Sequence, residues 1–454
     1  MKNAFYIHIF LLFISSTVEA QKVKWVNIIA NGHLVGSITS MDKDDEGNLY
    51  FSFNYTIDHG YLQGYSSHSK IFKINTDGET DWEIGGDSTF TPSIQDIVYI
   101  QNRLFAIGTY FTKITGEGKI VFEEKGYGMP KPTIAANKRF LVYPDWYLKE
   151  NENLLEVKLV KSGFNKNIEW AADLPEVIAD EKVAISNDAI YFAYKKISGG
   201  QRFLRKYDFE GKLQWEINTG IFHFDLKTDE YGNAYLAGHF IGSGGVMKIK
   251  PTGEVAWVLS YPGYSFHSCL IEKNVVHLGG YEWTANYEST AYAAVNANNG
   301  ELISIKNLEM FPEGRNQANH LVKHGNTIYL GGSANVNGNQ TYPRAFLAKL
   351  EVEDIVIPNP TNIKEHKKEE GRIKVYPNPS YNSQFSIEYI NPVATGLLII
   401  SISNSLGLNV FSKEIPSFSG NHKEEVVLQN AAPGVYIVLL KMGEAVEQKK
   451  IVLR

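Results

Sequence analysis

The sequence predicts an all-β protein, a β-propeller of about seven blades followed by a small immunoglobulin-like β-sandwich. Segments of alternating apolar and polar residues are separated by Gly, Asn and Pro turns, which is typical of short antiparallel strands. Two short motifs recur through most of the chain at intervals of about 35–55 residues, the period of propeller blades. The composition, with 26 Tyr, 24 Phe and 39 Gly, suits strands joined by many turns.

The clearest repeat covers residues 221–261 and contains four predicted strands. In its first strand Phe222, Phe224 and Leu226 alternate with polar residues, so we expect these three side chains on one buried face. A single four-stranded sheet cannot bury both of its faces, so the repeat needs neighbouring copies. The three later strands are expected at residues 234–238, 246–250 and 255–259.

Two motifs mark the copies. One is a Gly-Asn turn just before an aromatic strand residue, found at residues 47–50, 232–235 and 325–329. The other is a Gly followed four positions later by an aromatic residue. Its examples are Gly78 with Trp82, Gly118 with Phe122, Gly211 with Trp215, and Gly253 with Trp257, and Trp170 resembles them after a longer turn. A long β-sandwich or a β-solenoid is the alternative, but this period favours four-stranded blades.

The two ends of the repeat region complement each other. The last copy, from about residue 319 to 353, has three predicted strands and lacks a fourth strand with a Trp. Residues 23–29 look like an orphan fourth strand that contains Trp25. If this strand completes the last blade, the ring is closed by its two ends and no long sheet edge stays open.

Residues 1–20 are predicted to be a secretory signal peptide. Lys2 supplies the positive charge, residues 4–14 form an apolar stretch too short to span a bilayer, and Val18-Glu19-Ala20 is a small-residue cleavage site. A buried first strand is the alternative. Residue 21 is Gln rather than Cys, so the signal is not that of a lipoprotein. No later stretch is long and apolar enough for a membrane helix.

The net charge and the single cysteine argue against a nucleic-acid-binding, a membrane-binding and a disulfide-stabilised protein. The net charge of -6 implies neither a nucleic-acid groove nor a polybasic membrane patch. Cys269 is the single cysteine and cannot form an internal disulfide, so a large core must hold the exported protein together. We expect Cys269 to be an inert buried thiol rather than a nucleophile.

The face that carries the long joins between second and third strands is the candidate functional face. These joins and the connections between blades must share one face, and binding sites are usually carried by loops on a rigid scaffold. Exposed aromatic rings can stack on sugars or peptides, while rings that only fill gaps between blades are the alternative. The candidate binding aromatics are Tyr61, Tyr65, Trp146, Trp283 and Tyr287.

Polar residues also gather where the innermost strands should begin, around the central channel. The candidates are His223, Asp225, His267 and His320, accompanied by Gln95, Asp96 and Asn319. Histidines with a carboxylate could bind a metal or act as acid and base, while solvated channel lining is the alternative. No fixed metal-ligand spacing is present, so we predict no metal, no cofactor and no catalytic residue.

Two resemblances to known families follow. The Gly-x-x-x-Trp hairpins in residues 204–220 resemble the blades of quinoprotein-type (PQQ-like) propellers. Quinone-dependent dehydrogenases of that family use a vicinal Cys pair and a calcium site. Because this chain has one Cys, the resemblance implies the fold and not the activity.

Residues 373–454 resemble the type A C-terminal sorting domain of the type IX secretion system. The resemblance rests on residues 375–380 (VYPNPS), 400–407 (ISISNSLG), 433–438 (PGVYIV) and 449–453 (KKIVL). It implies passage through the periplasm, delivery by the type IX secretion machinery, and release from or attachment to the outer surface. A plain C-terminal binding sandwich is the alternative.

The predicted organisation is a signal peptide at 1–20, a propeller at 21–354, a polar linker at 355–372 and the sorting domain at 373–454. We predict a secreted or cell-surface propeller that is a non-catalytic binding or adhesion module for a glycan or protein ligand. The alternative is a secreted hydrolase or lyase that acts on a polysaccharide through channel His and Asp residues.

Overall fold

The computed structural model divides the chain into two compact units, Met1–Pro358 and Asn359–Arg454. Every helix or strand assigned among the described residues is a β-strand, and none of these residues forms a helix able to cross a membrane. The described residues are 10–12, 21–29, 35–58, 65–85, 93–125, 132–148, 155–174, 178–240, 243–283, 288–308, 310–311, 314–335, 343–352, 373–391, 398–404, 409–416, 420–429, 431–442 and 445–454.

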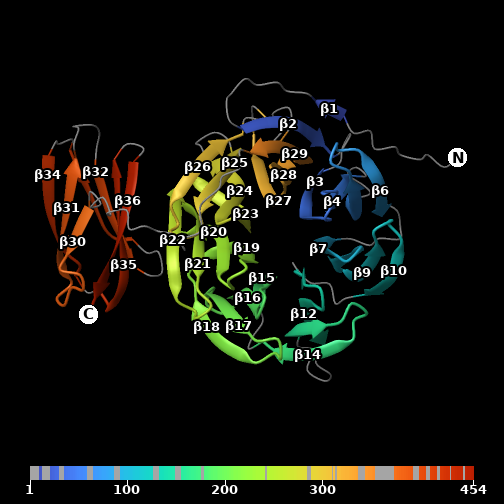
Figure 1. Ribbon diagram of the computed structural model, residues 1–454, viewed down its shortest axis with the longest axis horizontal. Coiled ribbons are helices and arrows are strands. Elements are labelled where there is room, and N and C mark those ends of the chain that lie inside the picture. Colours follow the sequence, from blue (N-terminus) through green and yellow to red (C-terminus); the bar gives the residue numbers. More distant parts are fainter. Residues whose placement is uncertain are drawn as a thin grey trace. The chain divides into compact units, whose positions relative to one another are not determined.

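The described part of the first unit forms seven sheets, which we call blades 1 to 7. Figure 1 shows them arranged around a central axis. Blades 1 to 3 are β3 (Val35–Lys43), β4 (Leu49–Asp58), β5 (Tyr65–Ile74) and β6 (Thr80–Gly85); β7 (Ile94–Ile100), β8 (Arg103–Gly108), β9 (Tyr110–Thr115) and β10 (Ile120–Lys125); and β11 (Ala135–Ala136), β12 (Leu141–Leu148), β13 (Leu155–Ser162) and β14 (Ile168–Asp173).

Blades 4 to 7 follow in chain order. They are β15 (Ile178–Ile185), β16 (Ile190–Lys196), β17 (Arg202–Tyr207) and β18 (Leu213–Asn218); β19 (Phe222–Thr228), β20 (Ala234–Phe240), β21 (Ser243–Ile249) and β22 (Val255–Pro262); β23 (Tyr264–Glu272), β24 (Val275–Trp283), β25 (Glu288–Asn296) and β26 (Leu302–Asn307); and β27 (Asn316–His324), β28 (Thr327–Ala334) and β29 (Arg344–Val352) with β2 (Gln21–Ile28). Each innermost strand contacts that of the next blade, and β27 contacts β3, so the circle is closed.

The N-terminal strand completes blade 7, as predicted. Strand β2 pairs antiparallel with β29, with Trp25 opposite Lys349 and Ile28 opposite Phe346. A further strand, β1 (Phe10–Leu12), pairs with the outer edge of β2. Strand β1 lies inside the predicted signal peptide, whose other residues lie outside the described ones, so the signal peptide stays a prediction. The closure joins the first blade strands to the last across the whole repeat region.

The Trp residues of the Gly-x-x-x-Trp motif join blades 1, 3, 4 and 5 each to the blade that follows. Trp215 of blade 4 donates a hydrogen bond from Nε1 to the carbonyl oxygen of Pro251 in blade 5, 2.9 Å away. Gly253 lies under the Trp215 ring at a φ of 88°, where a Cβ atom would come within 3.2 Å of the indole. The same arrangement joins Trp82 to Gly116 and Gly118, Trp170 to Phe209 and Gly211, and Trp257 to Ala297 and Gly300.

The Gly-Asn turn is held by an aspartate and a tyrosine. Asp229 accepts hydrogen bonds from the backbone and side-chain nitrogens of Asn233, both at 2.8 Å, and from the hydroxyl of Tyr235 at 2.9 Å. In blade 1, Asp44 makes the equivalent bonds to Asn48 and Tyr50. The recurring turn sequence therefore reflects a closed hydrogen-bond network, in which Asn closes the turn and Tyr anchors it to the strand.

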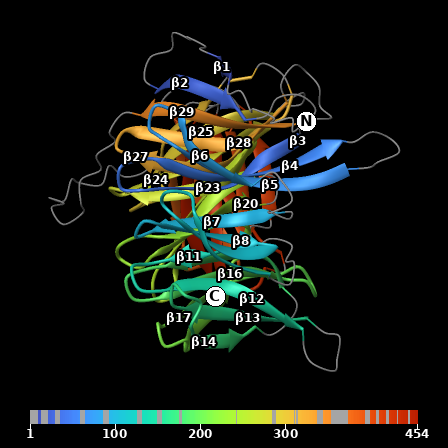
Figure 2. The same ribbon diagram turned by 90° about the vertical axis from the view of Figure 1, so that its right-hand side faces the viewer.

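Strand ends place the long joins on one side of the ring. Edge-on, the β4–β5 and β12–β13 hairpins both extend toward the same side (Figure 2). The first residues of the innermost strands lie on that side too, since Val35 of β3 pairs with Thr56 near the end of β4. The second strands extend into these joins, since β4 continues to Asp58 and β24 to Trp283.

The second unit is a two-sheet sandwich. One sheet contains β30 (Ile373–Tyr376), β31 (Gln384–Asn391) and β34 (Gly420–Val427). The other contains β33 (Asn409–Ile415), β32 (Leu398–Asn404), β35 (Gly434–Met442) and β36 (Ala445–Leu453). Apolar side chains from both sheets form one core, in which Ile387 and Val426 of the first sheet meet Ile402 and Val438 of the second.

The first and last sequence pieces of this unit are bonded to each other. Asn378 donates from Nδ2 to the carbonyl oxygen of Lys450 at 2.7 Å and accepts from the backbone N–H of Val452 at 3.0 Å. Ser380 and Arg454 add a backbone bond of 2.8 Å. The VYPNPS piece therefore holds the KKIVL piece, which belongs to the last strand, in place through backbone hydrogen bonds.

Candidate functional site

A one-residue bulge interrupts the innermost strand of five blades near its start. Each bulge leaves one residue outside the ladder, and such bulges re-aim a side chain. The bulge residues are Thr39, Gln95, Phe224, His267 and Asn319, and all five line a central cavity of about 370 Å³. In blade 4 the register skips two residues, Asp180 and Glu181, before Lys182.

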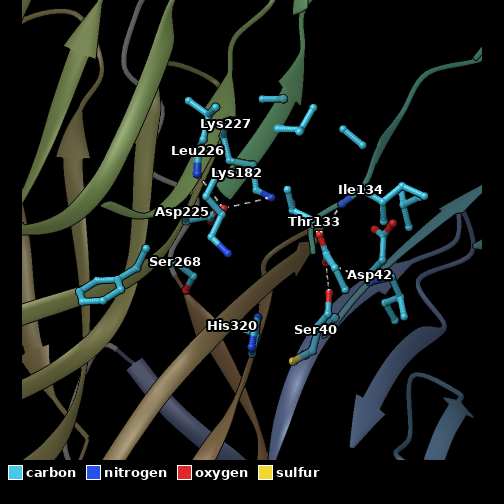
Figure 3. A pocket seen from close by; sticks show the side chains of 18 of the residues that line it. Ser40, Asp42, Thr133, Ile134, Lys182, Asp225, Leu226, Lys227, Ser268 and His320 are labelled. Carbon is cyan, nitrogen blue, oxygen red and sulfur yellow. Dashed lines mark hydrogen bonds and ion pairs between the residues drawn. The ribbon is translucent and has the colours of Figure 1, made fainter. Parts of the chain in front are cut away.

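The residues that follow the bulges form a second set of cavity-lining groups. They are Ser40, Asp96, Lys182, Asp225, Ser268 and His320, one from each blade with an innermost bulge. Figure 3 shows Lys182, Asp225 and Lys227 on one wall, with Ser40, Asp42 and Thr133 on the other. The cavity is therefore polar and carries both positive and negative charges.

Asp96 ties three blades together. Its Oδ1 atom accepts hydrogen bonds from the hydroxyl of Ser40 at 2.6 Å and from the backbone of Ile97 at 3.0 Å. Its Oδ2 atom accepts hydrogen bonds from the hydroxyl of Thr133 and from the backbone N–H of Ile134, both at 2.9 Å. These two residues precede β11. Both oxygens are occupied, so Asp96 acts as a strut between blades 1, 2 and 3.

Asp42 makes a similar link between blades 1 and 2. Its two oxygens accept the backbone N–H groups of Lys43 at 2.8 Å and Tyr99 at 2.7 Å. Burial raises the pKa of the Asp42 carboxyl to about 6, although both hydrogen bonds act in the opposite direction.

Asp225 links blades 5 and 6. Its oxygens accept from the backbone of Leu226 and of Cys269, each at 2.9 Å, and Oδ1 lies 3.5 Å from Nζ of Lys227. The Asp225 carboxylate raises the pKa of Lys227 above its ordinary value. Cys269 is buried, and burial raises the pKa of its thiol, which confirms the predicted buried cysteine.

Lys182, Lys227 and His320 are basic side chains in the cavity wall. The Lys227 side chain is 51% exposed, so its ammonium group faces open space. Lys182 makes no hydrogen bond or ion pair with the described residues, and its charge acts on His320. Burial and the positive charge of Lys182 lower the pKa of His320 to about 4, so this imidazole is neutral at neutral pH.

A row of rings runs outward from the cavity across blades 5 and 6. Phe224 stacks on His267 with centroids 4.0 Å apart, and His267 packs against Tyr281 at 5.2 Å. Tyr281 contacts Trp283 at 6.2 Å, and Trp283 contacts His239 at 4.8 Å. Phe224 is 38% exposed and Trp283 is 41% exposed, so the row offers apolar faces to solvent at both of these positions.

The predicted binding residues are therefore divided. Asp225, His267 and His320 meet at the cavity, and Trp283 belongs to the adjoining ring row. For Tyr65 and Trp146 the structure describes only the backbone pairing, opposite Asp58 and Val157. Tyr61 and Tyr287 lie outside the described residues.

His223 was expected at the channel, but the structure places it in the core. It is 3% exposed, and its Nε2 atom lies 2.8 Å from the carbonyl oxygen of Asp180. The bulge at Phe224 is the reason, because His223 takes the buried position that Ile38 and Ile94 hold in blades 1 and 2. For the same reason, the prediction that Phe222 and Phe224 are buried is wrong, since both are at least 38% exposed.

Sequence reasoning missed the two lysines and Asp42. Lys182 lies on a strand from which no channel residue was predicted. Lys227 follows the predicted His223 and Asp225, but the bulge at Phe224 changes which residues of this strand face the channel. Aligning the copies on the bulge, rather than on the turns, would have placed Lys182 level with Asp96 and Asp225. Among the described residues, no cluster of three or more His, Cys, Asp or Glu could hold a metal ion.

Comparison with solved structures finds propellers of low sequence identity. The Dos1 propeller has 7% identity and a TM-score of 0.46, over 72% of this chain and 95% of that one. Sqt1 of Chaetomium thermophilum has 11% identity and a TM-score of 0.42, over 65% and 80%. The dihydro-heme d1 dehydrogenase NirN has 13% and 0.39, over 59% and 57%. These values say nothing about the ligand or activity of this chain.

Comparison of the sequence itself identifies the C-terminal segment. No curated protein matches the chain. Residues 374–454 match the family described as the secretion system C-terminal sorting domain, which covers almost all of the second unit's strands. The protein therefore carries a type IX sorting domain at its C-terminus, and it is exported by that system to be secreted or attached to the outer surface.

Proposed function

We propose that the exported ring is a non-catalytic binding module whose ligand is a carbohydrate. The observation that carries this proposal is the ring row that starts in the cavity at Phe224 and continues to Trp283. Phe224 is 38% exposed and Trp283 is 41% exposed. The apolar C–H face of a sugar ring stacks on such a surface, while its hydroxyl groups need polar partners nearby.

The cavity next to the ring row offers those partners. Gln95, Asn319 and Ser40 bring amide and hydroxyl groups to its wall. The volume of about 370 Å³ falls within the roughly 300–1,000 Å³ of small-molecule sites. A sugar residue at the mouth would therefore find both a stacking face and hydrogen-bond partners.

The channel carboxylates support binding rather than hydrolysis. Asp42, Asp96 and Asp225 each accept two or more hydrogen bonds, and at least one bond to each comes from a neighbouring blade. A general acid or base must be free to exchange its proton with a substrate atom. The rival function, a polysaccharide hydrolase or lyase, has one observation in its favour, because burial raises the pKa of Asp42 to about 6.

A glycan array probed with the purified full-length protein tests the proposal. We expect a restricted set of bound glycans, and loss of about three- to tenfold in affinity in Phe224→Ala and in Trp283→Ala. Phe122→Ala is the matched control, since Phe122 is 39% exposed on β10 and lies outside the cavity. Absence of glycan binding, or equal loss in the control, contradicts a carbohydrate site.

Incubation of the same protein with each bound glycan separates binding from catalysis. Mass spectrometry should find the glycan unchanged after prolonged incubation. Cleavage that is retained by Phe122→Ala and abolished by Asp42→Asn would overturn the non-catalytic assignment in favour of the hydrolase or lyase.

A further inference from the structure

We infer that the bound sugar is acidic, and that Lys182 and Lys227 hold its anionic substituent, a carboxylate or a sulfate, inside the central cavity. This inference rests on the proposed carbohydrate function and names the ligand class of the same site. Both lysines line the cavity from adjacent blades, Lys182 from β15 and Lys227 from β19 (Figure 3).

The first argument concerns the availability of the two ammonium groups. Lys182 has no ion pair or hydrogen bond within the described part of the chain. Lys227 forms one ion pair, with Asp225, whose Oδ1 atom is 3.5 Å away, beyond ordinary hydrogen-bond distance, and the charges of Asp96 and Asp42 also act on it. By contrast, lysines on the third strands of the same two blades are used internally: Lys206 donates to the carbonyl oxygen of Pro251 and Lys248 to that of Ala297. The cavity lysines thus differ from the structural ones in keeping unused donors.

The second argument concerns the acidic groups of the cavity. Asp42, Asp96 and Asp225 line the same space, and their oxygens already accept backbone or hydroxyl donors from their own strands and from neighbouring blades. Donors directed at these carboxylates stabilise their negative charges in place. The lysines are therefore not needed to satisfy the carboxylates, and an incoming anion can compete for them.

The third argument concerns His320 and the apolar side of the cavity. His320 is neutral at neutral pH, because burial and Lys182 lower its pKa to about 4. It can hydrogen-bond a ligand without adding charge, which leaves anion recognition to the lysines. Phe224 is the bulge residue of β19 and lines the cavity. Lys227, three residues after Phe224 on the same strand, lines the cavity too. A sugar ring on Phe224 therefore lies beside a wall that carries ammonium groups.

The test compares sugars that differ only in charge. Isothermal titration calorimetry on the full-length protein would use tetragalacturonate, its fully methyl-esterified form as the neutral match, and a sulfated oligosaccharide. We expect the acid to bind at least about tenfold more tightly than the ester, because one charge-assisted hydrogen bond is worth about that factor. The sulfated probe shows which of the two anionic substituents the cavity prefers.

Variants assign the effect to the cavity. Lys182→Gln and Lys227→Gln should each weaken the acidic probe about tenfold and leave the ester unchanged. Lys250→Gln is the control, since Lys250 is an exposed lysine of blade 5 that pairs with Glu254 outside the cavity. Thermal melting of each variant reports whether the fold is intact, and full-length folded protein is required for every comparison.

The outcomes separate this inference from the proposed function. Equal binding of acid and ester, or unaltered acid binding in both cavity variants, overturns the inference and leaves a neutral-glycan site standing. Failure of every sugar to bind the folded protein overturns both. Acid binding that falls in Lys182→Gln and Lys227→Gln alone supports both.

Discussion

Lys349 donates a hydrogen bond from Nζ to the carbonyl oxygen of Thr76 at 2.7 Å, although 273 residues separate the two. The bond joins blade 7 to the turn of blade 1 that precedes Gly78. Lys161, Lys206 and Lys248 make the same bond to the next blade. Each is paired across its sheet with the Trp residue that packs on a Gly of that next blade, a contact that we call the Gly-Trp lock. Trp25 takes this cross-strand position opposite Lys349. The head-to-tail seam thus repeats the lysine-to-carbonyl bond of the internal seams.

Deletion of residues 23–29 should therefore open the ring. The deletion removes Val26, which is 5% exposed in the blade 7 core, and leaves β29 as an unpaired edge. We expect the free energy of unfolding to fall by at least about 3 kcal/mol, since burial of one Val contributes about 1.5–3 kcal/mol and strand pairing is lost as well. Thermal and urea unfolding measure this. A melting temperature equal to that of the intact chain would contradict the role of β2 in closure.

Gly211→Ala should destabilise the ring more than Gly263→Ala does. Both glycines have positive φ, 85° and 80°, so each Ala variant carries a similar backbone strain of about 1–2 kcal/mol. Only at Gly211 would the new Cβ lie 2.8 Å from the Trp170 indole, whereas Gly263 has no atom within 4 Å. Urea unfolding of the two variants isolates the lock. Equal losses would mean that the Gly-Trp contact is not needed.

Glu181→Gln should stabilise the protein at alkaline pH. Glu181 is 1% exposed, neither carboxylate oxygen has a hydrogen-bond partner among the described residues, and burial raises its pKa to about 7. The folded pKa exceeds that of the unfolded chain, so stability falls as pH rises from about 4.5 to above 7. The shift corresponds to about 3 kcal/mol at about 1.4 kcal/mol per pKa unit. The gain from Gln should appear at pH 8 and shrink at pH 5; a gain independent of pH would contradict this.

His223→Gln should reduce the acid sensitivity of the ring. Burial lowers the pKa of His223 to about 4, so the folded state resists protonation and stability falls as pH drops from about 6.5 to 4. Gln keeps an N–H donor for the carbonyl oxygen of Asp180 and cannot be charged. Urea unfolding between pH 7.5 and 4 should show a loss about 3 kcal/mol smaller in the variant than in the parent. Parallel pH profiles would show that His223 does not titrate in this way.

Removal of residues 373–454 should abolish export. The truncated protein is expected inside the cell envelope, while the full chain reaches the medium or the outer surface. Asn378→Ala should reduce export in part, because Asn378 holds the backbone of Lys450 and Val452 in the last strand. Val410→Ala is a suitable control, as Val410 is 42% exposed on β33. Immunoblots of the fractions measure delivery, and normal surface delivery of the truncation would refute the role of the segment.

The sequence predicted the ring, its closure through residues 23–29 and the C-terminal domain, because each rests on local signals that repeat. Turn residues such as Asn233 and lock residues such as Trp215 have the same neighbours in several blades. These signals were strong because each copy repeats the same physical contact.

The site was harder to predict, because it depends on register. A bulge adds one unpaired residue to its strand, and every residue on one side of the bulge then points to the opposite face of the sheet. Nothing in the local pattern of Phe222 to Lys227 reveals that Phe224 is the extra residue, so His223 was assigned to the channel and Phe224 to the core. Lys182 and Lys227 were missed because the channel forms only when blades distant in sequence meet.

The bulges also place cavity-lining side chains at positions that take no part in strand pairing. Thr39, Gln95, Phe224, His267 and Asn319 stand outside the ladders that hold their strands, so their replacement leaves the pairing partners unchanged. At the bulges, the side chain that lines the cavity is thereby separate from the backbone pairing, whereas Lys182 and Lys227 stand within their ladders, opposite Ala193 and Tyr235. A lineage of such rings can exchange one ligand for another through a few substitutions, while the frame and its delivery label stay as they are.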